Sequence, residues 1–229
     1  MCLNLKNSLI SDWVRELMFD FNVDMAQGYS IYGNEDEFEI AKYASSVNIS
    51  AGFHSGDPMK IKDAMLFVQQ HNKALGVHIG YPDIQGFGKR KMNLSDNELE
   101  ANVIYQVGAI ATYAQTYDLE IENVRCHGAM KELLNEDANT AIVIARAVKK
   151  ISPWLNLIVQ NPQTKNIVEA EGLKAAIEFE FRENSSIREI RELPTKPDTI
   201  HFRTLADIKR AYEIIKPTPV NYNRVSEQI

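Results

Sequence analysis

Short apolar runs alternate with longer amphipathic segments along most of the chain. The short runs are typical of buried strands, and they cover residues 17–23, 47–51, 75–79, 121–126, 155–159, 174–179 and 199–202. The longer segments repeat apolar residues at a spacing near 3.6, which predicts helices at residues 35–43, 58–72, 96–117, 135–150, 163–171 and 204–215. This alternation predicts a parallel α/β sheet of about seven strands, open or closed.

Capping residues mark the start of two of these helices. Asp57 is a plausible N-cap, and Pro58 is tolerated in the first turn because its missing N–H is not needed there. Ser95 is followed three residues later by Glu98, which is the pattern of a capping box.

The domain organisation follows from the absence of breaks in the pattern. No linker rich in glycine, proline or serine and no internal repeat interrupts it. We therefore expect a single domain over residues 1–229, with an N-terminal extension at residues 1–16 and an irregular tail at residues 216–229. Residues 182–197 are charged and weakly periodic, so we expect a surface excursion there.

Composition narrows the class of protein. The 229 residues are 45% hydrophobic, as in ordinary globular chains, and the net charge of −6 disfavours nucleic-acid binding. No apolar run approaches the roughly 18 residues of a membrane span, and the N-terminus has no secretory signal. Cys2 and Cys126 cannot make a disulfide framework, so we expect a cytoplasmic protein with free thiols.

Four unusual polar residues fall at the carboxyl ends of predicted strands. Asp24, His54, His78 and His127 end or follow these strands, where parallel α/β folds build their active sites. We interpret all four as candidate catalytic residues, since histidine titrates near neutrality. Asp24, His54 and His78 are also a candidate ligand set for a divalent metal of unknown identity. The alternative is that each histidine satisfies a backbone group.

Two glycines bracket His54 in the segment NISAGFHSGDP at residues 48–58. Gly52 and Gly56 allow sharp turns and a close approach of the backbone to a ligand. Asp57 could cap the next helix, orient His54 or hold a substrate amine, and capping alone explains it adequately.

A second irregular loop covers residues 78–92. A loop of this length in a compact domain is usually functional or mobile. Its basic tip at residues 89–91 could hold a carboxylate or phosphate through Arg90, or could be a solvated turn. The tip lacks the spacing of a nucleotide phosphate-binding loop. Asp83 is either a substrate ligand or the start of a turn.

Asp20, Asn22 and Asp24 share one face of the first strand, because side chains alternate along a strand. In a barrel this face is the lumen, where polar groups need partners. A shared ligand or metal is one such partner, which makes Asn22 a candidate substrate ligand. A buried hydrogen-bond network is the other.

Four ordered segments resemble the LamB/YcsF family, which includes the A subunit of bacterial 5-oxoprolinase. The family opens with D-L-N-A-D-x-G-E, where DFNVDMAQG stands here, and its block N-I-A-C-G-F-H-A-G-D-P matches NISAGFHSGDP. Its G-A-H-P-S-F/Y-P-D, F-G-R-R and V-K-P-H-G-A-L-Y-N correspond to GVHIGYPD, FGKR and VRCHGAMKE. The resemblance covers residues 19–182, more than half of the chain.

The resemblance implies a distorted, TIM-like β/α barrel related to polysaccharide deacetylases and other carbohydrate-active barrels. It implies a site at Asp24, His54, His78 and His127. It also implies ATP-dependent opening of the lactam of 5-oxoproline to glutamate, together with partner B and C subunits. An unactivated amide is a poor electrophile, so the lactam oxygen must be phosphorylated or polarised while a base or metal delivers water.

The chain departs from the family at several positions, which are Gln27, Arg125, Cys126, Lys131, Glu132 and Phe181. Arg125 stands where the family has lysine, and an arginine cannot lose its proton as a lysine can. We treat Arg125 as a candidate substrate ligand. The family's closing His-Gly-Asp segment has no counterpart after His201.

Three functions follow from these observations. The first is a hydrolase that resembles the A subunit of 5-oxoprolinase. The second is a catalytically weakened homologue that binds a small ligand or a partner, which the departures favour. The third is a metal-dependent hydrolase of the polysaccharide deacetylase type, which rests on fold analogy alone.

Overall fold

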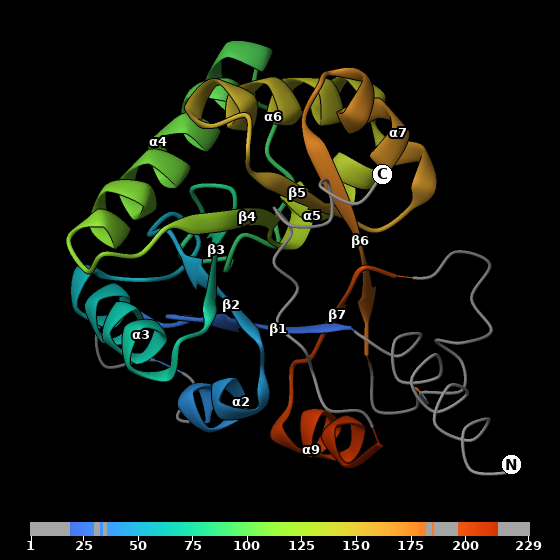
Figure 1. Ribbon diagram of the computed structural model, residues 1–229. Helices are drawn as coiled ribbons and strands as arrows, with labels where there is room; N and C mark the ends of the chain where they lie inside the picture. The colour runs from blue at the N-terminus through green and yellow to red at the C-terminus, as the bar shows by residue number, and fades with distance from the viewer. Residues whose placement is uncertain (1–18, 30–32, 34–35, 182–184, 186–196, 215–229) are drawn as a thin grey trace, which may run out of the picture.

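Seven parallel strands close into a barrel in the computed structural model, which describes residues 19–29, 33, 36–181, 185 and 197–214. The strands are β1 (Asp20–Met25), β2 (Ser46–Ser50), β3 (Ala74–Ile79), β4 (Ile121–Cys126), β5 (Asn156–Val159), β6 (Lys174–Glu180) and β7 (Thr199–His201). Each strand pairs with the next, and β7 returns to β1 so that Thr199 lies opposite Asp20 (Figure 1). The predicted TIM-like barrel is confirmed, in its closed form.

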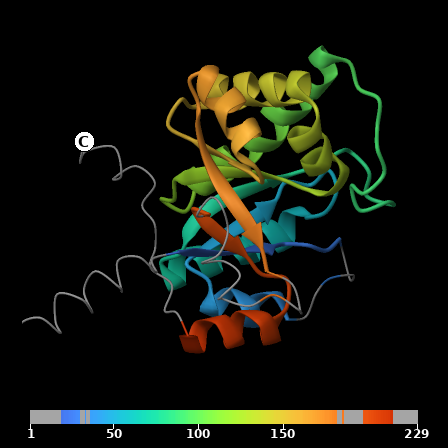
Figure 2. The same ribbon diagram turned by 90° about the vertical axis from the view of Figure 1, so that its right-hand side faces the viewer.

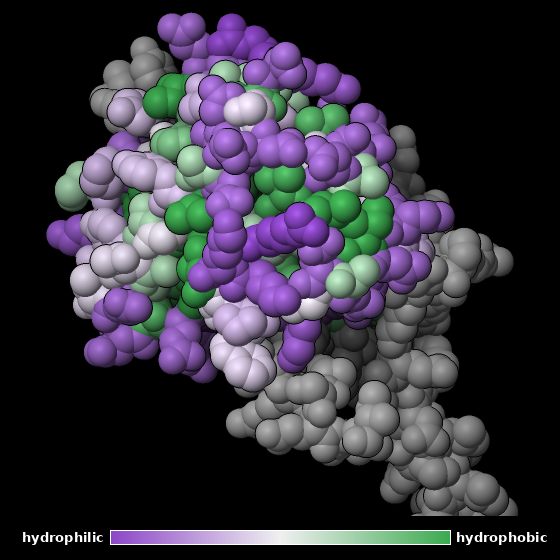
Figure 3. All heavy atoms as spheres, turned by 90° about the horizontal axis from the view of Figure 1, so that it is seen from above, coloured by the Kyte–Doolittle hydropathy of each residue, from purple (hydrophilic) through white to green (hydrophobic). Residues whose placement is uncertain are grey.

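Helices cover the outside of the barrel. They are α2 (Glu37–Tyr43), α3 (Pro58–His71), α4 (Asp96–Gln115), α5 (Gly128–Glu136), α6 (Ala138–Ile151), α7 (Pro162–Ala170) and α9 (Leu205–Ile214). α4, α6 and α7 lie on one side of the strands, and α2 and α9 lie on the opposite side (Figure 1, Figure 2). Hydrophilic side chains dominate the face seen from above in Figure 3, with apolar ones between them. Within the described ranges, no helix has the length and apolarity needed to span a bilayer.

The capping residues begin α3 and α4 as predicted. The carboxylate of Asp57 accepts hydrogen bonds from the backbone N–H groups of Met59 and Lys60, at 2.9 and 3.0 Å. Ser95 and Glu98 form the reciprocal capping box of α4. Local sequence was sufficient here because both partners of each bond lie within one helical turn.

The segment after β4 differs from the prediction. The pattern predicts one helix over residues 135–150, whereas the chain forms α5 directly after His127 and then α6. The break comes at Asp137, whose carboxylate accepts a hydrogen bond from the N–H of Thr140 at 2.7 Å and so caps α6. α5 buries only Ala129, Met130 and Leu134, which is too sparse a pattern to stand out in a polar segment.

Several predictions at the ends of the chain fall outside the described residues. These are the extension at residues 1–16, the tail at residues 216–229, most of the excursion at residues 182–197, and Cys2.

The first strand, predicted over residues 17–23, runs from Asp20 to Met25. Cys126 is a buried free thiol, as expected.

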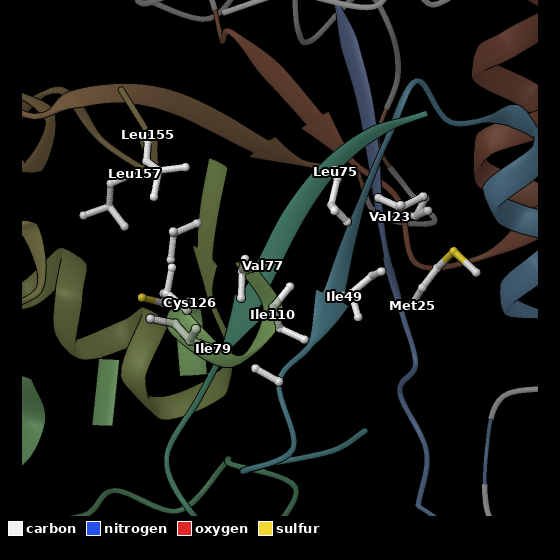
Figure 4. Close-up of a cluster of buried hydrophobic side chains, with 14 of the residues drawn as sticks. Val23, Met25, Ile49, Leu75, Val77, Ile79, Ile110, Cys126, Leu155 and Leu157 are labelled. Carbon is white, nitrogen blue, oxygen red and sulfur yellow. The ribbon is translucent and has the colours of Figure 1, made fainter. Parts of the chain in front are cut away.

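Outward-facing strand residues form the hydrophobic layer beneath the helices. Phe21, Val23 and Met25 of β1 are fully buried, and they alternate with the polar residues of the lumen. Figure 4 shows part of this layer, in which Val23, Met25, Ile49, Leu75, Val77 and Ile79 gather with Ile110 of α4. This packing fixes which face of each strand points into the barrel.

A hydrogen-bond network fills the lower lumen. Asp20 accepts hydrogen bonds from the hydroxyl groups of Ser46 and Thr199, at 2.8 and 2.7 Å. The amide of Asn22 donates to Thr199 at 2.7 Å and to Glu178 at 3.2 Å. Of the two kinds of partner expected for this strand face, Asp20 and Asn22 therefore have the buried network.

Candidate active site

The barrel brings the four candidate catalytic residues together at the carboxyl ends of β1 to β4. The rings of His54 and His127 stack, with centroids 4.2 Å apart and 6° between their planes. His78 meets both rings edge-on, with centroid distances of 4.9 and 4.8 Å. Nδ1 of His78 lies 3.4 Å from Oδ1 of Asp24. Residues far apart in the sequence therefore form one contiguous cluster.

The loop after β3 closes over this cluster. Gly88 has a positive φ of 65°, and a Cβ at this position would lie 2.8 Å from Cβ of His54 and 3.1 Å from Cδ2 of His127. The carbonyl oxygen of Phe87 lies 2.8 Å from Nε2 of His127. Because a carbonyl only accepts, Nε2 of His127 carries the proton and donates, and its Nδ1 keeps the lone pair.

Asp83 and Arg90 hold the shape of this loop. Asp83 accepts a hydrogen bond from the N–H of Gly86 at 2.9 Å and forms an ion pair with Arg90 through two nitrogens. The hydrogen bond from Arg90 lowers the pKa of Asp83 to about 2. Arg90 is not among the residues that line the cavity. Contact of either residue with a substrate stays a prediction.

The clustered imidazoles are neutral near pH 7. Burial, reinforced by the neighbouring His127, lowers the pKa of His54 to about 3, and burial lowers the pKa of His127 to about 4. His54 is 1% exposed, and neither of its ring nitrogens has a hydrogen-bond partner in the described part of the chain.

Arg125 is the buried cation of the lumen. Its guanidinium donates to Glu178 at two points, with both distances 2.8 Å, and its Nη1 donates to the two oxygens of Asp24 at 3.3 and 3.2 Å. Burial is the largest single effect and raises the pKa of Asp24, but Arg125, His201 and His127 together with the hydrogen bond from Asn48 outweigh it and hold that pKa below the ordinary value. Asp24 is therefore ionised at neutral pH.

A cavity of about 380 Å³ opens beside the cluster. Its lining is Val23, Asp24, Gln27, Ile40, Phe87, Lys89, Arg125, His127, Gly128, Lys131, Glu132, His201, Phe202 and Arg203. Lys131 and Arg203 each form an ion pair with Glu180. Lys89, by contrast, makes no ion pair with any described residue. His54 and His78 pack behind the cavity, and four of the six departures from the family pattern line it.

His201 is a site residue that the strand-end argument did not include. Its Nδ1 lies 2.8 Å from Oδ1 of Asn22, and its Nε2 lies 3.5 Å from Oδ2 of Asp24. The strand-end position that marked His78 and Asp24 as candidates also marks His201, because His201 is the last residue of β7. Only the closure of β7 onto β1 places it beside Asp24.

The three clustered histidines are also the group, within the described ranges, that could hold a metal ion. Ligand atoms of His54, His78 and His127 lie within 4.8 Å of one another. This set differs from the predicted ligands Asp24, His54 and His78, because the oxygens of Asp24 face Arg125 instead. Whether the group fits a metal depends on where the ring lone pairs point.

The role of Asp57 can be tested by removing its carboxylate. Asp57→Ala should lower the free energy of unfolding by about 1 kcal/mol, because two N–H groups of α3 lose their acceptor. Asp57→Ser keeps an acceptor and is the matched control. Urea denaturation measures both variants. A change in substrate binding with unaltered stability would instead favour the predicted substrate contact.

Acid should destabilise the protein through its buried histidines. In the unfolded chain histidine titrates near 6.5, whereas the pKa values of His54 and His127 in the fold are about 3 and about 4. The unfolded chain therefore binds more protons in this interval, so the free energy of unfolding falls as the pH drops below about 6.5. Denaturant titrations near pH 7.5 and near pH 5 measure the effect. Equal stability at both values would contradict it.

Comparison with known proteins identifies relatives of the chain. The sequence model of the LamB/YcsF family matches residues 19–192. The A subunit of 5-oxoprolinase from Thermus thermophilus is 38% identical over 158 residues, covering 69% of this chain and 62% of the relative. The protein of the same name from Alkaliphilus metalliredigens is 34% identical over 199 residues, covering 86% of this chain and 77% of the relative.

A solved structure supports the same relationship. The crystal structure of the lactam utilization protein from Thermus thermophilus superposes with a TM-score of 0.77 at 28% identity, covering 85% of this chain and 94% of that chain. The chain thus spans less than two thirds of the Thermus sequence relative, although it covers nearly all of this structure.

Proposed function

Because the chain belongs to the LamB/YcsF family, we propose that it is a hydrolase of the same type as the A subunit of 5-oxoprolinase. In this proposal it opens the lactam of 5-oxoproline to glutamate, with ATP and with partner B and C subunits. The names of the relatives support the substrate class. The observation that carries the proposal is the cavity in which an ionised Asp24, a neutral His127 and His201 converge.

The reaction needs activation of the amide and a base for the attacking water. ATP, used together with the partner subunits, supplies the free energy that makes the unactivated lactam carbon open to attack. The residues of this chain would bind the substrate, place the water and accept its proton. No phosphate-binding loop pattern is present in the sequence, which accords with a nucleotide handled together with partners.

His201 and Asp24 are the groups that we propose to hold the water. Oδ1 of Asn22 only accepts, so Nδ1 of His201 carries the proton and Nε2 of the neutral ring keeps its lone pair. That lone pair and Oδ2 of Asp24 are two acceptors 3.5 Å apart, both at the cavity. A water molecule between them would donate to both, and either can take its proton during attack.

Lys89 is the residue that we propose to bind the carboxylate of 5-oxoproline. Lys131 and Arg203 are paired with Glu180, whereas Lys89 lines the cavity without a carboxylate partner in the described part of the chain. Its ammonium lies 5.6 Å from the centroid of the Phe87 ring. The sequence pattern points to Arg90 for this task, but Arg90 is bound to Asp83.

The activity is tested by reconstitution. The purified chain is combined with B and C subunits of a related 5-oxoprolinase, and glutamate formed from 5-oxoproline and ATP is measured. Turnover that depends on this chain supports the proposal. Thermal stabilisation by 5-oxoproline without any turnover would favour the non-catalytic homologue instead. The proposal also places the protein in the cytoplasm, where ATP is available.

His201→Gln tests the proposed base. Glutamine keeps a donor toward Asn22 but cannot take a proton, so turnover should fall about 10²- to 10⁴-fold with little change in KM. His71→Gln, on the exposed end of α3, is the control and should leave turnover unchanged. Wild-type turnover in His201→Gln, or an unaltered pH profile in a slowed variant, would remove His201 from the mechanism.

A further inference from the structure

Arg125 places a nitrogen at the point where Asp24 and His78 converge. Its Nη1 lies 3.3 and 3.2 Å from the two oxygens of Asp24 and 3.2 Å from Nε2 of His78. This point is where a divalent ion shared by the predicted ligands Asp24 and His78 would have to sit. The guanidinium charge already occupies it.

Two further carboxylates fix the position of Arg125 on the side away from Asp24 and His78. The two-point pair with Glu178 orients the planar guanidinium, and a third carboxylate, Glu180, accepts from Nη2 at 3.2 Å. Glu178 is itself held by the amide of Asn22. The side chain of Arg125 is 3% exposed, so little room exists for it to swing away.

The lone pair of His78 is not free for a metal. A guanidinium donates and cannot accept, so Nε2 of His78 must accept from Arg125 and carries the lone pair of the neutral ring. Nδ1 then carries the proton and faces Asp24 at 3.4 Å. His78 thereby accepts a hydrogen bond from a cation on one side and faces an anion, without a hydrogen bond to it, on the other.

The nitrogen lone pairs of His54 and His127 do not point to one common position. The lone pair of an imidazole lies in the plane of its ring, and zinc binds it there at about 2.0–2.1 Å. The planes of His54 and His127 are 6° from parallel in a stack with centroids 4.2 Å apart. An ion in the plane of one ring therefore lies well outside the plane of the other. As arranged, the three histidines and Asp24 do not fit a metal.

We infer that Arg125 is a built-in cation that takes the place of a divalent metal between Asp24 and His78. The site of the native chain is then metal-free, and Asp24 and His78 are positioned by a guanidinium. A corollary follows from the surrounding charges. Once Arg125 is replaced by a neutral side chain, Asp24, His78 and Glu178 remain as two carboxylates and an imidazole, which is a ligand set suited to Zn²⁺ or Mn²⁺.

The test is metal binding by the purified chain, which needs no activity. After dialysis against a chelator, ZnCl₂ and MnCl₂ are titrated into the native chain and into Arg125→Met by calorimetry, and the bound metal is counted by mass spectrometry. We expect no stoichiometric site in the native chain. We expect about one equivalent in Arg125→Met, with a metal-dependent rise in Tm.

Matched variants locate the acquired site. In the Arg125→Met background, His78→Ala should abolish metal binding, and His71→Ala, which changes an exposed histidine on α3, should leave it intact. If Arg125→Met does not fold alone, refolding in the presence of Zn²⁺ supports the inference. The double variant Arg125→Met with Glu180→Gln, which removes one of the three carboxylates that contact Arg125, then replaces the single variant in the titration.

Two results would overturn the inference. One is a stoichiometric zinc or manganese site in the native chain that is lost on Asp24→Asn or His78→Ala. The other is a folded Arg125→Met protein, or its double variant, that gains no metal site. The native-chain titration decides the main claim even when no variant folds.

Discussion

Asp24→Asn should lower the rate of glutamate formation in the reconstituted complex by about 10²- to 10⁴-fold. Asparagine has the size of aspartate, but it has no charge and cannot accept a proton from water. Asp24 lines the cavity, and Arg125 is the largest of the charges that together keep it ionised. The substitution therefore removes the anion that faces His201 while leaving the cavity walls in place.

The control for this variant separates catalysis from folding. Asp63→Asn changes an exposed aspartate on α3 and should leave turnover unchanged. Denaturant titration of Asp24→Asn should show that it remains folded, since Arg125 keeps its bonds to Glu178. Turnover within about twofold of the native rate would show that Asp24 does not take part in the chemistry.

Arg125→Met should lower the free energy of unfolding by about 3–5 kcal/mol, the usual loss when one member of a buried ion pair is removed. Three carboxylates depend on this guanidinium, since Asp24, Glu178 and Glu180 all lie within 3.3 Å of its nitrogens. Lys131 and Arg203 still compensate Glu180, but Asp24 and Glu178 lose their main counter-charge. Urea denaturation near pH 7.5 in the presence of a chelator measures the loss.

Acidification should narrow the difference in stability between this variant and the native chain. Without Arg125, burial raises the pKa of the remaining carboxyl groups above their unfolded values. Such groups stabilise the fold below the unfolded pKa and lose that contribution as the pH rises. Arg125→Met should therefore regain stability relative to the native chain on acidification. Adding Glu178→Gln to the variant should recover part of the loss, and a loss below about 1 kcal/mol would contradict the account.

The sequence pattern by itself determined a parallel α/β sheet of about seven strands and the placement of most site residues at the strand ends. It left the sheet open or closed, and only the family resemblance implied a barrel. The alternation of strand and helix patterns is local, and side chains alternate along each strand, so the face and the end of the strand that carry Asp24 and His78 follow from counting residues. The same applies to His54 and His127, which follow their strands directly. The helix N-caps at Asp57 and Ser95 could also be predicted from the sequence, because their hydrogen-bond partners lie within one helical turn.

Only the tertiary structure decided what these residues contact. Arg125 pairs with Glu178 across 53 positions of sequence. His201 bonds to Asn22 across 179 positions, because β7 closes onto β1. A residue pattern carries no information about which side chains meet across a lumen, since strand register and barrel closure set those distances. For the same reason the sequence offered Asp24 and His78 as metal ligands. Only the closed barrel places the guanidinium of Arg125 between them.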